Sequence, residues 1–233
     1  MQTIGLIGGM TWESTELYYR IINREVQKRL GGLHSARILL HSIDFDDMAA
    51  LQRAAKWEEA AALLSAAGRH LVQGGARFLA LCCNTMHCVS DVIERDAGAP
   101  LMHIADPLGS AVRDTELSTI GLLGTRYTME KPEVITARLA DKYGLRVLVP
   151  EGEEALEVHR IIYEELGRGA FRDVSRAFYR RAMAHLIARG AQGIVLGCTE
   201  LPLIIKPEDS PVPLFDTAEL HARAIAARAL EDA

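Results

Sequence analysis

The stretch "GGARFLALCCNT" (residues 74–85) returns as "RGAQGIVLGCTE" (residues 189–200), 115 residues later in the chain. A second stretch, "TIGLIGG" (residues 3–9), returns as "TIGLLGT" (residues 119–125) at an offset of 116 residues. Two matches at nearly the same offset predict that the chain contains two units of similar topology. A pair of units with so long a period is not a solenoid, which stacks at least three shorter repeats.

Short apolar runs alternate with longer stretches of helical periodicity along the whole chain. Such alternation is typical of parallel sheets that are covered by helices on both faces. Strands are predicted at residues 3–9, 36–43, 77–82, 101–105, 119–125, 145–150, 193–198 and 212–216, and helices at residues 12–30, 46–73 (as one helix or two), 153–166, 171–189 and 217–231.

We therefore predict an α/β fold of two pseudo-symmetric lobes, each a parallel sheet flanked by helices, with the active site between them. The N-terminal lobe is expected to comprise residues 1–113 together with residues 214–233. The C-terminal lobe is expected to comprise residues 114–213.

The composition limits the classes of function. The 233 residues, 49% of them hydrophobic, suffice for sizeable cores. The net charge of −5 gives no sign of a nucleic-acid surface, and no segment reaches the ~18 apolar residues of a membrane span. The N-terminus lacks a basic region before its apolar run, which favours a buried strand over a secretory signal. A cytoplasmic protein with reduced thiols, without nucleic-acid or membrane partners, is expected.

The repeat divides the four cysteines into two kinds. It aligns Cys83 with Cys198, and each follows the carboxyl end of a predicted strand, where open parallel sheets bind ligands. Cys82 should point to the opposite face of its strand, and we interpret Cys82 and Cys88 as packing residues. Two thiols that flank one carbon suit stereoinversion, since one can remove a proton from one face while the other protonates the opposite face. The thiol pKa of about 8.5 can be lowered by helix N-termini.

Other readings of the same stretch are weaker. A zinc site formed by Cys82, Cys83, His87 and Cys88 lacks the second distant pair of ligands that structural zinc usually has, so no metal is predicted. "GLIGGM" (residues 5–10) lacks the G-x-G-x-x-G spacing of a dinucleotide loop.

The residues that follow the two cysteines carry polar groups. Asn84, Thr85 and Thr199 are predicted to open helices, where their amide, hydroxyl and N–H groups suit a carboxylate. His87 has two open interpretations, as a pocket residue or as a solvated helix residue. Glu200 could orient or tune Cys198, or could simply complement the helix dipole.

Six motifs in order resemble the cofactor-independent aspartate/glutamate racemases, over nearly the whole chain. They are "GLIGGMTWEST" (residues 5–15), "CNTMH" (83–87), "LLGTRYTM" (122–129), "VHRIIYEEL" (158–166), "GCTEL" (197–201) and "PLFDT" (213–217). The resemblance implies racemisation of an amino acid, aspartate and/or glutamate, by a homodimer that needs neither pyridoxal phosphate nor metal. It implies Cys83 and Cys198 as the catalytic bases, with Met10, Gln52, Asn84, Thr85, Thr125, Thr128, Thr199 and Glu200 as substrate-binding residues.

The resemblance leaves the substrate open. Aspartate-specific relatives use cationic side chains for the distal carboxylate, and the nearest candidate here is Arg53. The motif "VHRIIYEEL" carries Glu164 and Glu165 where some archaeal relatives place a lysine. Pro132 also stands where relatives usually carry another residue. A broad-specificity racemase of neutral amino acids such as homoserine, a related cysteine-dependent isomerase or decarboxylase, and a catalytically silent amino-acid-binding protein are the alternatives.

Overall fold

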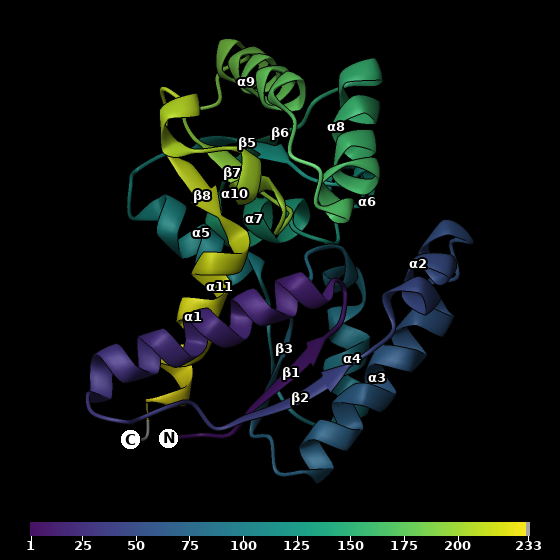
Figure 1. The fold of residues 1–233 in the computed structure, drawn as a ribbon, viewed down its shortest axis with the longest axis vertical. Coiled ribbons are helices and arrows are strands. Elements are labelled where there is room, and N and C mark those ends of the chain that lie inside the picture. Colours follow the sequence, from purple (N-terminus) through teal and green to yellow (C-terminus); the bar gives the residue numbers. More distant parts are fainter. Residues whose placement is uncertain (232–233) are drawn as a thin grey trace. The chain divides into compact units, whose positions relative to one another are not determined.

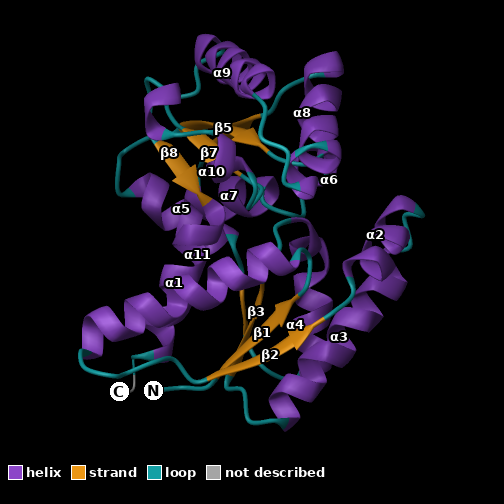
Figure 2. Cartoon of the chain, viewed as in Figure 1, coloured by secondary structure: helices purple, strands orange, loops and turns teal. Residues whose placement is uncertain are grey.

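A computed structural model describes residues 1–231, which contain two parallel four-stranded sheets (Figures 1 and 2). The first sheet has the order β2-β1-β3-β4 and the second the order β6-β5-β7-β8, so the two units repeat one topology. The predicted α/β fold of two similar units is thereby confirmed. The strands are β1 (Ile4–Gly8), β2 (Ile38–Ser42), β3 (Phe78–Leu81), β4 (Leu101–Met102), β5 (Thr119–Leu123), β6 (Arg146–Leu148), β7 (Ile194–Leu196) and β8 (Leu214–Asp216).

Helices connect the strands. They are α1 (Trp12–Leu30), α2 (Phe45–Arg53), α3 (Trp57–Gln73), α4 (Ser90–Ala97), α5 (Ala105–Arg113), α6 (Arg126–Glu130), α7 (Thr136–Tyr143), α8 (Gly152–Glu164), α9 (Asp173–Ala188), α10 (Leu201–Ile204) and α11 (Thr217–Ala229), with 3-10 helices η1 (Thr85–Val89), η2 (Leu166–Arg168) and η3 (Pro207–Asp209).

The long helices lie where the sequence pattern predicts them, whereas several short helices were not predicted. The helices α4, α5, α6 and α7 have at most nine residues, which is shorter than the window in which helical periodicity can be recognised. The predicted helix over residues 46–73 is two helices, separated by Ala55 with a φ of 54°. The predicted strand over residues 101–105 ends at Met102, because α5 begins at Ala105.

Helices cover both faces of the first sheet. A Cβ placed on Gly5 would lie 3.3 Å from Leu71 of α3, and one placed on Gly8 would lie 2.5 Å from Thr15 of α1. Residues an odd number of positions apart in a strand point to opposite faces. The helices α1 and α3 therefore pack on opposite faces of β1, as Figure 1 shows. In the second sheet a Cβ on Gly121 would lie 3.0 Å from Leu186, which places α9 directly against β5.

The chain divides into two compact units with boundaries that differ from the predicted ones. The second unit is Ile104–Leu220, and the first comprises Met1–His103 and the chain from His221 onward. The assignment of residues 104–113 to the N-terminal lobe was wrong, because Asp106 of α5 accepts hydrogen bonds from Arg138 of α7. The assignment of residues 214–220 to that lobe was also wrong, because β8 pairs with β7 in the second sheet.

Each unit has its own core. The first includes Leu64 of α3 and Leu79 of β3, and the second includes Ile161 of α8 and Met183 of α9. None of the helices in residues 1–231 is both long enough and apolar enough to traverse a bilayer.

Candidate active site

The first thiol lies at the carboxyl end of the first sheet. Cys83 follows β3, is partly buried, and packs against an apolar cluster that contains Met10 and Met86. Met10, in the turn after β1, is 4% exposed. Gln52 of α2 is also buried, and its Nε2 donates to the Met86 sulfur at 3.1 Å. Met10 thus belongs to the same apolar cluster as Met86, Cys83 packs against that cluster, and Gln52 is hydrogen-bonded to Met86.

Asn84 and Thr85 are buried beside this thiol, with 5% and 6% of their surfaces exposed. The Oδ1 atom of Asn84 is fully buried and accepts no hydrogen bond from the described residues. Leaving a buried polar atom unsatisfied costs about 1–3 kcal/mol. A ligand that brings an N–H group, such as an amine, would remove this cost, so Asn84 is a candidate ligand-binding residue.

His87 anchors the turn that carries the thiol. Its side chain is 1% exposed, and its Nδ1 lies 2.8 Å from the Cys83 carbonyl oxygen and 3.3 Å from that of Asn84. A carbonyl oxygen can only accept, so Nδ1 carries a proton. The interpretation of His87 as a solvated helix residue was therefore wrong: the imidazole is buried and donates to the backbone at Cys83.

A buried group behind His87 was missed by the sequence analysis. The rings of His103 and His221 lie 4.7 Å and 5.7 Å from that of His87. His221 Nε2 lies 3.0 Å from the Met102 carbonyl oxygen and therefore donates to it, so that in the neutral ring Nδ1 accepts from the Tyr18 hydroxyl at 2.9 Å. His103 lies in the middle of the predicted strand over residues 101–105, and its distant partners could not be predicted from the sequence.

Cys82 packs in the interior of the first unit. Its side chain is fully buried. Burial raises the pKa of this thiol well above its usual range, and the charge of neighbouring Cys83 adds to the effect. Cys82 is therefore a neutral thiol, which confirms its predicted packing role. Within the described part of the chain, no group of three or more His, Cys, Asp or Glu residues is arranged to hold a metal ion.

The second thiol lies at the equivalent end of the second sheet. Cys198 follows β7, and its Sγ donates to Glu200 Oε2 at 2.8 Å. The Thr199 hydroxyl donates to the same oxygen at 2.9 Å. Glu200 is 9% exposed. Of the two interpretations of Glu200, the geometry supports the one in which its carboxylate orients and tunes the thiol.

Thr125 and Thr128 form a turn that packs beside Cys198. Thr125 caps α6 by accepting from the Thr128 backbone N–H at 3.3 Å, and the two hydroxyl oxygens are 3.2 Å apart. A Cβ on Gly124 would lie 3.2 Å from the Gly197 carbonyl oxygen. The turn after β5 thus packs directly against the turn after β7, and its two hydroxyl groups are buried there.

Asp216 is a further titratable group at the same strand ends, within the motif "PLFDT". It is aligned with Leu196 in the pairing of β8 with β7. Its Oδ1 accepts from the backbone N–H groups of Ala218 and Glu219 at 2.9 Å and 3.1 Å. Burial raises the pKa of Asp216 to about 6. The sequence analysis did not single out this carboxyl group.

Two residues singled out from the resemblance lie on the surface. The Arg53 side chain is 62% exposed, and its guanidinium lies 3.7 Å from the Asp46 carboxylate. Pro132 is exposed in the turn between α6 and α7, where its carbonyl accepts from the Ala137 N–H at 2.9 Å. Arg53 is thus oriented toward another surface side chain of α2.

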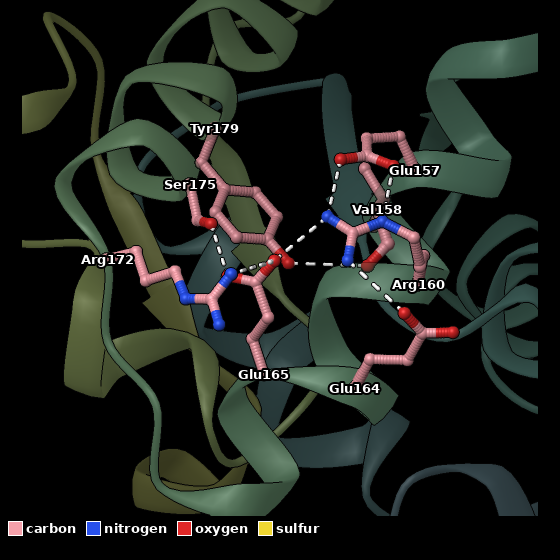
Figure 3. Close-up of polar contacts among 8 residues, drawn as sticks. All are labelled: Glu157, Val158, Arg160, Glu164, Glu165, Arg172, Ser175 and Tyr179. Carbon is pink, nitrogen blue, oxygen red and sulfur yellow. Dashed lines mark hydrogen bonds and ion pairs between the residues drawn. The ribbon is translucent and has the colours of Figure 1, made fainter.

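Glu165 forms an internal network of the second unit (Figure 3). Its carboxylate, 4% exposed, accepts from the Ser175 hydroxyl at 2.5 Å and from Arg160 at 2.9 Å, with Arg172 at 3.9 Å. The hydrogen bond from Ser175 and then that from Arg160 lower the pKa of Glu165 against the opposing effect of burial. Glu165 thereby joins the end of α8 to α9, which is a structural role.

Replacing Glu165 by glutamine should lower the free energy of unfolding by about 1–3 kcal/mol at pH 7, because it removes charge-assisted hydrogen bonds. The folded-state pKa of Glu165 is below the unfolded value of about 4.3. Its contribution is therefore complete above that value and is lost as the pH falls through the folded-state pKa. Urea unfolding at pH 7 and at pH 3.5 should show a larger difference between the two proteins at pH 7.

The matched control for this prediction is Glu164→Gln. The Glu164 side chain is 59% exposed and makes a 3.3 Å contact with Arg160. Such a surface pair contributes at most about 0.5 kcal/mol. A loss of stability in Glu164→Gln as large as that in Glu165→Gln would contradict the assignment of the network to Glu165.

Comparison with known proteins identifies the group to which this chain is related. The sequence model of the Asp/Glu/hydantoin racemases matches residues 7–225. The chain belongs to the Asp/Glu/hydantoin racemase family. A glutamate racemase of Pseudomonas aeruginosa is 28% identical over 166 residues, which cover 70% of this chain and 60% of that protein. The chain thus matches about 60% of the length of this curated relative.

Two solved structures resemble the whole chain. A protein of Yersinia pestis, determined as a candidate Asp/Glu racemase, is 48% identical, with 99% of this chain and 100% of that chain covered and a TM-score of 0.93. An aspartate racemase homologue from Pyrococcus horikoshii is 34% identical at the same coverage, with a TM-score of 0.83. The two-unit α/β fold is therefore that of the racemase family.

Proposed function

We propose that this protein is an amino-acid racemase in which Cys83 and Cys198 act as acid and base on opposite faces of one α-carbon. The observation that carries the proposal is the equivalent placement of the two thiols. Each follows the third strand in the chain order of its sheet, in two units of the same topology. Simple binding of a ligand does not require such a symmetric pair, whereas stereoinversion does.

The surrounding groups support the same reaction. One thiolate removes the α-proton, and the other thiol delivers a proton to the opposite face. The negative charge that develops on the substrate spreads into its carboxylate, where hydroxyl and amide donors can stabilise it. Asn84 and Thr85 beside Cys83, and Thr125, Thr128 and Thr199 beside Cys198, are the residues that we assign to this role. The buried Oδ1 of Asn84 suits the substrate amino group.

We propose aspartate and glutamate as the first substrates to test, because the relatives named above are glutamate and aspartate racemases or homologues. Two observations keep neutral amino acids open. Arg53 is exposed and lies near Asp46, and Glu165 is engaged by Arg160 and Ser175. Neither therefore supports a dedicated site for a second carboxylate.

The decisive experiment is incubation of single enantiomers in D₂O without added pyridoxal phosphate or metal. A panel of aspartate, glutamate, homoserine, serine and alanine reports activity and substrate range together. We expect optical inversion accompanied by one α-deuterium in the product. Binding without deuteration or inversion of any amino acid would indicate the silent binding protein. Decarboxylation of an α-arylmalonate, assayed separately, would indicate the related decarboxylase chemistry.

The oligomeric state is a separate prediction. The resemblance to the racemases implies a homodimer. Light scattering during size-exclusion chromatography should therefore give twice the chain mass of 25.6 kDa. A mass equal to that of one chain at micromolar concentration would contradict the dimer without affecting the proposed chemistry.

A further inference from the structure

The two thiols have different hydrogen-bonding environments. The Cys198 thiol shares one carboxylate oxygen of Glu200 with the Thr199 hydroxyl, at 2.8 Å and 2.9 Å. Carboxylic acids ordinarily ionise near pH 4 and thiols near pH 8.5. In this contact the Cys198 Sγ is the hydrogen-bond donor and Glu200 Oε2 the acceptor. A thiolate at this position would face the negative charge of Glu200 at hydrogen-bonding distance, which disfavours its formation.

The elements that adjoin Cys198 carry further ionisable groups. Tyr179 of α9 belongs to the core against which Cys198 packs. Burial and then the charge of Cys198 raise the pKa of Tyr179 far above its usual range, so its phenol is neutral. Asp216, at the end of the adjoining strand β8, adds a carboxylate above pH 6. The turn after β5 contributes the neutral hydroxyls of Thr125 and Thr128 and the cation of Arg126, which donates to the Tyr127 hydroxyl at 3.1 Å.

Neutral and hydrogen-donating groups lie beside Cys83. Its neighbour Cys82 remains a neutral thiol because of burial. The His87 ring donates from Nδ1 to the Cys83 carbonyl oxygen at 2.8 Å, and the ring of His103 follows at a centroid distance of 4.7 Å from His87. An imidazole thus donates to the backbone at Cys83, whereas the Cys198 thiol itself donates to a carboxylate.

We propose that Glu200 is a positioning residue that keeps the proton on Cys198 in the resting protein, so that Cys198 is the donor thiol and Cys83 the thiolate base. The catalytic meaning of this assignment rests on the proposed racemase function. In one turnover the Cys83 thiolate takes the α-proton and becomes a thiol. The Cys198 thiol gives its proton to the opposite face and becomes a thiolate. Proton exchange with solvent then returns a proton to Cys198 and removes one from Cys83.

The test is the pH dependence of alkylation of each thiol in the full-length protein. The tryptic peptide of residues 190–223 contains Cys198 as its single cysteine, because the bond between Lys206 and Pro207 resists trypsin, and fragment spectra separate the three cysteines of residues 78–95. Iodoacetamide rates are measured from pH 5.5 to 9.5. In the unmodified sequence we expect the alkylation midpoint of Cys83 to lie below that of Cys198.

The decisive variant is Glu200→Gln, which keeps an acceptor oxygen and removes the charge. The alkylation midpoint of Cys198 should fall by about one pH unit, so that its rate at pH 7 rises about tenfold, while the midpoint of Cys83 stays unchanged. Glu200→Asp keeps the charge and should shift the midpoint less. The matched control Glu208→Gln removes a carboxylate that is 67% exposed and pairs with Arg176, and it should leave both midpoints unchanged.

Two results would overturn the proposal. One is an unchanged Cys198 midpoint in a Glu200→Gln protein whose circular dichroism spectrum is native. The other is an equal shift in Glu200→Gln and Glu200→Asp, which would assign the effect to side-chain length rather than charge. Since alkylation does not depend on turnover, a negative result in the D₂O panel would contradict the racemase function and leave the role of Glu200 measurable.

Discussion

Replacing Cys83 by serine is expected to lower the rate of racemisation by about 10²–10⁴-fold, the usual contribution of an acid/base group. A serine hydroxyl has nearly the size of the thiol but does not ionise at neutral pH. The fold should be retained, because Cys83 lies at the edge of the core and is partly exposed. The same loss is expected for Cys198→Ser. The measurement is the rate of optical inversion together with α-deuteration in D₂O.

The matched control is Cys88→Ser in the same short segment. Cys88 is also partly exposed, lies in η1, and has no part in the proposed chemistry. Its substitution should change the rate by less than about twofold, since surface substitutions usually alter stability by no more than ~0.5 kcal/mol. Full activity in Cys83→Ser, or an equal loss in Cys88→Ser, would show that Cys83 is not an acid/base group.

Replacing Gly9 by alanine is expected to lower the free energy of unfolding by about 3–5 kcal/mol. Gly9 has a φ of +91°, and a Cβ there would lie 2.1 Å from the carbonyl oxygen and 2.6 Å from the nitrogen of Ile43. Both contacts are with backbone, which cannot rotate away. The cost therefore combines the strain of a left-handed conformation with overpacking. Urea unfolding followed by circular dichroism measures it.

Gly31→Ala separates the two contributions. Gly31 has a φ of +75°, but a Cβ there meets no atom within 4 Å. With a ψ of −172° it lies in a region that is essentially restricted to glycine, so its substitution should cost only the conformational penalty, about 1–3 kcal/mol. If both variants lost the same free energy, steric contact with Ile43 would not explain the requirement for glycine at residue 9. Because Gly9 precedes Met10, the Gly9→Ala substitution should also displace Met10 from the apolar cluster against which Cys83 packs.

The repeated sequence determined the features that depend on local pattern. Apolar runs of four to eight residues end at defined positions, and the repeat aligns two of those ends, so the eight strands, their parallel arrangement and the equivalent positions of Cys83 and Cys198 could all be predicted. The packing role of Cys82 could also be predicted, because side chains alternate along a strand and Cys82 therefore points to the opposite face from Cys83. Short helices and the exact unit boundaries could not be predicted, because a five- to nine-residue helix carries too little periodicity.

The contacts between distant segments were decided by tertiary structure. Tyr18 and His221 are 203 residues apart in the chain and 2.9 Å apart in space. The roles of His87 and Glu200 were undetermined in the sequence because each depends on a side-chain direction, toward the Cys83 carbonyl in one case and the Cys198 thiol in the other. The sequence by itself therefore determined where the two thiols stand in the fold. Packing between distant segments decided which groups surround each thiol, because burial and hydrogen bonding depend on neighbours that no local pattern specifies.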